Sequence, residues 1–160
     1  SFLADIIATP VSATPIPAIT ELPDGTEPNV QTREEITAVV RQLIACSNTG
    51  DLLRALALFS DEYLRRTLNP TGALTIEQAR EAIAEIATPF ALTSDLLILL
   101  VEIRDMRVLA DGRVVAVVVT DPPQEGLDTD LFIFARVDGD WIIEEAVSDW
   151  DQAEAATSTG

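Results

Sequence analysis

Five polar side chains are the best candidates for chemistry in this sequence, although their spacing is not diagnostic of any one reaction. They are Tyr63, Arg104, Asp105, Glu145 and Asp149. Carboxylates in an apolar cavity have a raised pKa and can act as bases. An arginine between two acids can hold a water molecule, and a tyrosine hydroxyl can donate to a developing oxyanion. In the alternative interpretation, which we prefer, Arg104 and Asp105 mark a strand irregularity and the other acids are solvated charges at strand ends.

Four further acids surround a loop that contains two prolines and a glycine. They are Asp121, Glu125, Asp128 and Asp130. Carboxylate and carbonyl oxygens are the ligands that calcium prefers, so the cluster is a candidate calcium site. Its spacing is not that of an EF-hand, and a charged loop between two strands is the ordinary explanation. We therefore predict no metal and no cofactor.

The residue types that are missing exclude several kinds of catalysis. The chain has no histidine, and all ten of its basic residues are arginine. A Ser-His-Asp or Cys-His nucleophile cannot be built, and neither can a lysine Schiff base. Cys46 is the only cysteine, which excludes an intrachain disulfide and a thiolate zinc cluster. It ends an apolar helical stripe, so we expect a buried thiol.

The charge balance excludes several partners. Twenty-seven acids face ten bases, for a net charge of −17, so phosphate backbones and anionic membrane surfaces are repelled. The longest apolar run, residues 96–101, is far shorter than the roughly 20 residues of a membrane span, and we predict no membrane insertion. We expect a secreted or cell-surface protein whose leader has been removed, with a trimmed N-terminus as the alternative.

Apolar residues at helical spacing predict three helices in the first part of the domain. Thr32 and Glu35 are expected to form a capping box at the start of the first helix. Asp51 is expected to cap the second helix, which has a short continuation to residue 68. Thr75 and Gln78 form another capping box at the start of the third.

After residue 89 the apolar period changes to two, which predicts an antiparallel sheet. The strand candidates are Leu96–Leu109, Arg113–Thr120, Asp130–Val137 and Trp141–Val147. Asp111-Gly112 and Asp138-Gly139 are strong hairpin signals between them. The parity of the apolar residues switches near Arg104-Asp105, which predicts a β-bulge and a strongly curved sheet. The fold class is therefore α+β, with three helices packed on the concave face of the sheet.

The second and third strands are apolar on both faces, as in Val114–Val119 and Leu131–Phe134. A strand that is apolar on both faces is covered on both faces. The helices would cover one face. The other face requires the N-terminal segment, a second subunit, or both.

Residues 1–31 form a proline-rich segment that we interpret as an extended arm or linker, outside the core of the domain at 32–151. Residues 152–160 would form a flexible tail. The aliphatic and aromatic residues of the arm must pack either on its own domain or on a neighbouring subunit, and we expect them to mediate assembly. These residues are Phe2, Leu3, Ile6, Ile7, Val11, Ile16 and Ile19.

The order of these elements is similar to that of the nuclear-transport-factor-2-like superfamily, and in particular to its SnoaL-like members. The resemblance rests on the first helix from Glu34, on Thr49-Gly-Asp51, on Ala57–Tyr63 and on the closing Asp138–Glu145, and it spans Glu34 to Asp151. It implies a cone of three helices and a curved sheet. The superfamily contains isomerases, dehydratases, cyclases and epoxide hydrolases, and also members without known chemistry, so the fold does not choose a function.

Two functional hypotheses follow from the sequence. The first is a non-catalytic extracytoplasmic module that self-associates through its sheet face and N-terminal arm into a homo-oligomer or filament. The second is a cofactor-free lyase, isomerase or hydrolase that acts on a small apolar ligand in the cone pocket. The second hypothesis requires at least two of Tyr63, Asp105 and Glu145 in one closed pocket.

Overall fold

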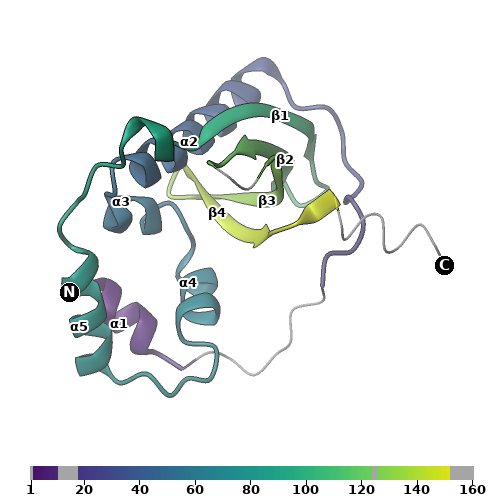
Figure 1. The fold of residues 1–160 in the computed structure, drawn as a ribbon. Helices are drawn as coiled ribbons and strands as arrows, with labels where there is room; N and C mark the ends of the chain where they lie inside the picture. The colour runs from purple at the N-terminus through teal and green to yellow at the C-terminus, as the bar shows by residue number, and fades with distance from the viewer. Residues whose placement is uncertain (1, 11–17, 124–125, 152–160) are drawn as a thin grey trace.

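The computed structural model of the chain describes residues 2–10, 18–123 and 126–151. Over these residues it has an α+β fold with five α-helices, one short 3₁₀ helix and a four-stranded antiparallel sheet of order β1-β2-β3-β4 (Figure 1). The helices are α1 (Phe2–Ala8), α2 (Val30–Asn48), α3 (Leu52–Leu56), α4 (Asp61–Leu68), α5 (Ile76–Ile86) and η1 (Ser94–Leu96). The strands are β1 (Leu99–Val108), β2 (Val114–Asp121), β3 (Asp128–Val137) and β4 (Asp140–Val147). Among the described residues, no helix is both long enough and apolar enough to cross a bilayer.

The turns and the irregularity of the sheet follow from local sequence. Asp138 and Gly139 both have positive φ, at 52° and 97°, which is the backbone of a tight hairpin turn between β3 and β4. The β1–β2 hairpin also forms, with Gly112 at a φ of 86°. The register of β1 shifts between Arg104 and Arg107, so the predicted bulge is confirmed, and Asp105 has a φ of 53° there.

Helix α2 lies against one face of the sheet, which we call the inner face. Ile36 and Val40 of α2 are fully buried against it. Leu58 and Phe59, from the turn after α3, join this cluster. The sheet residues of the inner cluster are Met106, Val114, Ala116, Val118, Phe132, Phe134 and Ile143.

The opposite or outer face of the sheet is covered by the chain itself. Its central residues are Val115, Val117, Leu131 and Ile133, all of them buried. Trp150 is 1% exposed and belongs to the same cluster, and the partly buried Ile19, Leu22, Leu109 and Val147 pack on it. The segment after Leu22 is also fastened to β1, since Thr26 and Val108 exchange two backbone hydrogen bonds of 2.9 and 2.8 Å. The cover that the doubly apolar strands require is therefore supplied in part by the residues before α2.

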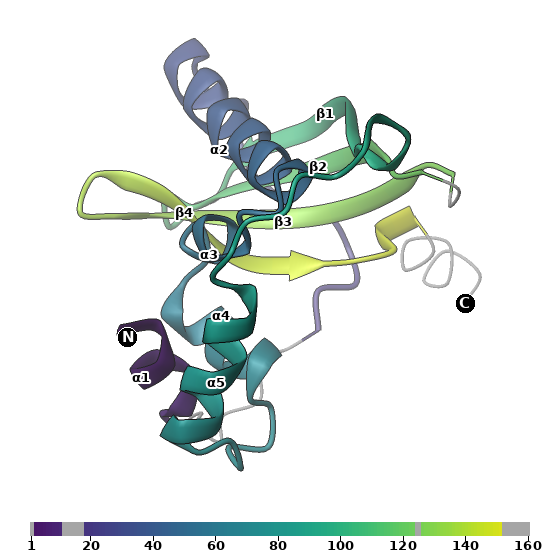
Figure 2. The ribbon, with the colours of Figure 1, turned by 60° about the vertical axis from the view of Figure 1, so that its left-hand side comes forward.

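Helices α1, α4 and α5 lie on the other side of the sheet from α2 (Figure 2). Ala4 and Ile7 of α1 are buried against Ala79 and Ile83 of α5. The prediction that the N-terminal residues are extended and lie outside the core is wrong for Phe2–Ala8. The first proline, Pro10, follows this helix instead of interrupting it.

Side chains of α4 and of Asn69, the residue that follows it, satisfy the last carbonyl groups of α1. Asn69 Nδ2 donates to the Ile7 carbonyl oxygen at 3.0 Å, and Arg65 Nε donates to the Ile6 carbonyl oxygen at 3.2 Å. Asn69 is 3% exposed, and its Oδ1 also accepts from the Leu74 amide at 3.0 Å. These bonds stabilise a seven-residue helix that is too short to form alone.

Two predictions about the helices are corrected by the structure. Helix α2 is capped by Asn29, whose Oδ1 accepts from the Thr32 amide at 2.8 Å. Glu35 does not close a capping box, because its carboxylate accepts from Trp141 and Arg136 and joins α2 to the β3–β4 hairpin. The helices also do not all pack on the inner face, since α5 buries its apolar side mainly against α1. The predicted caps Asp51 and Thr75–Gln78 are confirmed, and Cys46 is buried as expected.

Candidate functional site

A pocket of about 530 Å³ opens between the C-terminal half of α2 and the inner face of the sheet. We call it the inner pocket. Most of its wall is apolar. It is lined by Val40, Leu43, Ile44, Ser47, Leu92, Leu96, Ile98, Val118, Thr120, Pro122, Pro123, Asp128, Asp130 and Phe132.

One wall of the inner pocket is the strap, residues 90–98, which connects α5 to β1. Asn48, the last residue of α2, holds the strap through two bonds to Ile98: its Nδ2 donates to the carbonyl at 2.9 Å, and its Oδ1 accepts from the amide at 2.8 Å. Gly50 follows with a φ of +64°, and a Cβ atom there would lie 1.9 Å from the Phe90 carbonyl oxygen. The short polar Asn48 and the bare backbone of Gly50 thus let the strap close against the end of α2.

Asp130 places a carboxyl group in this apolar wall. It lies on β3 opposite Val118, and it has the same parity as Phe132, so its side chain is on the inner face. Asp130 Oδ1 is buried and has no hydrogen-bond partner among the described residues. A buried polar atom without a partner costs free energy, which identifies this position as a candidate functional group.

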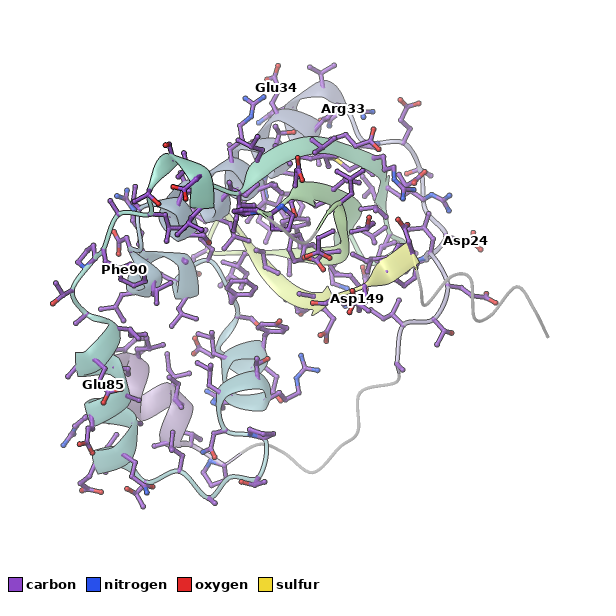
Figure 3. All side chains as sticks on the ribbon, viewed as in Figure 1. Asp24, Arg33, Glu34, Glu85, Phe90 and Asp149 are labelled. Atoms are coloured by element: carbon purple, nitrogen blue, oxygen red, sulfur yellow. The ribbon has the colours of Figure 1, made fainter. Side chains whose placement is uncertain are left out.

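The surroundings of Asp130 favour its protonated form. Burial raises the pKa of Asp130 to about 6, and the negative charge of Asp128 adds to the shift. Asp149, beside the end of β4 (Figure 3), raises this pKa further through its charge. Hydrogen bonds from the Ser148 side chain and the Asp149 backbone oppose the shift and do not cancel it. The site therefore holds a carboxyl group that can exchange a proton near neutral pH.

The five residues that the sequence proposed for catalysis do not form one site. Glu145 faces outward and pairs with Arg66 of α4 at 2.8 Å. Arg66 also lies over the ring of Tyr63, at 5.8 Å from its centroid, and Tyr63 stacks on Phe59 at 5.0 Å. Glu145 and Arg66 line an outer cleft of about 500 Å³, which also includes Ile133 of the outer face and so lies on the opposite side of the sheet from the inner pocket.

Arg104 and Asp105 belong to the bulge of β1, as the structural interpretation expected. Arg104 donates to Asp105 and to Asp151, at 2.9 Å in each case, and Asp105 is exposed. The requirement for two of Tyr63, Asp105 and Glu145 in one closed pocket is not met, because the lining of the outer cleft includes Glu145 without Tyr63, and Asp105 is exposed.

The candidate calcium ligands also separate. Asp128 and Asp130 line the inner pocket, whereas Asp121 is exposed. Glu125 lies outside the described residues. Within the part of the chain that the structure describes, no three acidic or cysteine side chains are placed to hold a metal ion.

Sequence reasoning did not find Arg66, and it named Asp130 only as a candidate calcium ligand and not as a carboxyl group in an apolar pocket. Arg66, the partner of Glu145, has no local signal, because 79 residues separate the two. Asp130 does have a local signal: it precedes Phe132 and Phe134 at a period of two, so a carboxylate occupies the apolar face of a strand.

Comparison of the chain with family models, curated proteins and solved structures finds no match.

Proposed function

We propose that this protein binds a small, mostly apolar molecule in the inner pocket, with the carboxyl group of Asp130 as the polar anchor. Binding pockets of this kind combine an apolar lining with a few polar groups that orient the ligand. The partnerless Asp130 Oδ1 in the apolar wall is the observation that carries the proposal. A helix enclosed by a bent sheet also supports the nuclear-transport-factor-2-like, SnoaL-like assignment, which remains a proposal about the family.

The site of binding can be tested by nuclear magnetic resonance. We would titrate the ¹⁵N-labelled protein with 1-octanol, a neutral apolar probe with one hydroxyl group. Saturable shifts are expected for the amides of Leu43, Ser47 and Ile98, around the inner pocket. No saturable shift, or shifts confined to the outer cleft, would reject the proposal. Turnover of a bound molecule that depends on Asp130 would place the cofactor-free lyase, isomerase or hydrolase activity in this pocket.

Self-association of an extracytoplasmic module is the second candidate. Fewer of the predicted assembly residues are available for it than the sequence suggested. Ile6 and Ile7 are buried within the chain, and Ile19 packs on the outer face, while Val11 and Ile16 lie outside the described residues. Phe2 is 78% exposed and lines the apolar groove between α1, α3 and α4, about 360 Å³ in volume, with Leu3. Insertion of Phe2 from one copy into the groove of another would use the same patch on both copies, which favours a two-fold homodimer.

Solution mass tests this second candidate. Light scattering at about 0.15 M salt, which screens the charge of −17, would compare the wild type with Phe2→Ser. A mass above that of one chain for the wild type, reduced in the variant, supports self-association through α1. A monomeric wild type at high protein concentration would eliminate it. Phe90→Ser, at an exposed phenylalanine outside the groove, is the matched control.

A further inference from the structure

The charges around the inner pocket indicate what kind of molecule it takes. We infer that the ligand is an amphipathic cation: an apolar body that lies between α2 and the sheet, with one ammonium or guanidinium group at Asp130 and Asp128. This inference rests on the proposed function, because it names the ligand class for the same pocket.

Uncompensated negative charge is the first observation behind the inference. Asp128 and Asp130 line the pocket, and Asp149 lies close enough to act on Asp130 through its charge. No ion pair involves any of these three residues among the described residues, although seven of the ten arginines have carboxylate partners elsewhere. A cation would satisfy Asp130 Oδ1 and reduce the repulsion among the three carboxylates.

The composition of the other walls is the second observation. The side of α2 contributes Val40, Leu43, Ile44 and Ser47, and the strap contributes only leucine and isoleucine. The lining from β2 and the loop after it consists of valine, threonine and proline. All charged groups of the lining are therefore at one end of β3, and an apolar body with a charge at one end matches this arrangement. A metal ion would not fill the apolar remainder of the pocket.

Three probes of equal chain length would test the charge: octylammonium, 1-octanol and octanoate, titrated calorimetrically at about pH 7.5 and low salt. We expect octylammonium to bind at least about tenfold more tightly than 1-octanol, a difference of about 1.4 kcal/mol, and octanoate to bind more weakly than both. At about pH 5, below the pKa of Asp130, the advantage of octylammonium should shrink while 1-octanol is unaffected.

Two double variants distinguish specific binding at Asp128 and Asp130 from the general attraction of a cation to an acidic protein. Asp128→Asn with Asp130→Asn should abolish the preference for octylammonium over 1-octanol, and an unchanged amide spectrum away from the pocket would show that the variant is folded. Glu81→Gln with Glu85→Gln removes the same charge from exposed positions of α5, remote from the pocket (Figure 3), and should preserve the preference. If both double variants lost the preference for octylammonium equally, net charge alone would explain that preference and the inference would be overturned.

The remaining outcomes distinguish the two proposals. If 1-octanol binds in the inner pocket as tightly as octylammonium, the cation inference is wrong and the proposed function stands. If none of the three probes perturbs the amides around the pocket, both are rejected. If octanoate binds most tightly, the cation inference is overturned and the carboxyl group of Asp130 acts as a hydrogen-bond donor instead.

Discussion

Asp130 is the residue at which the pocket and the stability of the fold are coupled through pH. Its folded pKa of about 6 lies above the ordinary value of 3.8, so the folded state binds its proton more tightly than the unfolded state does. Folding is therefore favoured by this group at low pH, and that contribution is lost as pH rises from about 4 through about 6.

Asp130→Asn should remove this loss, because asparagine does not ionise. At about pH 7.5 we expect the variant to be more stable than the wild type by about 1 kcal/mol, a figure reduced for the partial solvent exposure of the side chain. At about pH 4 the difference should be close to zero. Urea unfolding at both values measures it. A stability difference that does not change with pH would show that Asp130 titrates normally.

The strap depends on the close approach of Gly50 and Phe90, which is a feature at the scale of elements. Gly50→Ala should be strongly destabilising, because alanine disfavours the positive φ and its Cβ would overlap the Phe90 carbonyl. Gly72→Ala is the matched control: its φ is +66°, and the nearest atom to a Cβ there is Pro10 Cα at 3.9 Å.

Both alanine variants share the backbone cost of about 1–2 kcal/mol, so the excess in Gly50→Ala reports the packing of the strap. We expect that excess to be at least about 1 kcal/mol in urea unfolding, together with weaker binding of 1-octanol. Equal destabilisation in the two variants would show that the strap can move away from α2 without cost.

The docking of α1 is the second prediction at this scale. Asn69→Ala removes the donor to Ile7 and the acceptor from Leu74 in a buried position, and we expect a loss of about 2 kcal/mol of stability. Amide exchange in α1 should accelerate more than exchange in α2. Thr67→Ala, at an exposed position of α4, should have little effect. Unchanged exchange in α1 would contradict the arrangement of helices described above.

At the scale of the whole molecule, excess negative charge opposes folding. Most arginines already have carboxylate partners, so many of the 27 acidic residues repel one another in the compact state. Raising sodium chloride from about 0.02 to about 0.5 M should therefore raise the urea midpoint, because screening reduces the repulsion more than it weakens exposed ion pairs. A lower midpoint at high salt would mean that the ion pairs dominate.

The amino-acid sequence by itself determined the features that depend on near neighbours. The cap at Asp51, the capping box at Thr75, the Asp138-Gly139 turn and the bulge at Asp105 all form as expected. Each of them is specified by hydrogen bonds or backbone angles within a few residues, so local types and spacing suffice to predict it. The same holds for the need to cover both faces of β2 and β3, which follows from side-chain parity alone.

Only the tertiary structure decided which elements meet and which polar groups share a site. A helix at Phe2–Ala8 is stabilised because Arg65 of α4 and the adjacent Asn69 supply donors to Ile6 and Ile7 from about 60 residues away. Glu145 pairs with Arg66, and Asp130 enters an apolar pocket, through contacts among segments that are remote in the chain. Burial and charge at a site are sums over all surrounding elements, so neither can be obtained from the spacing of residues along one strand.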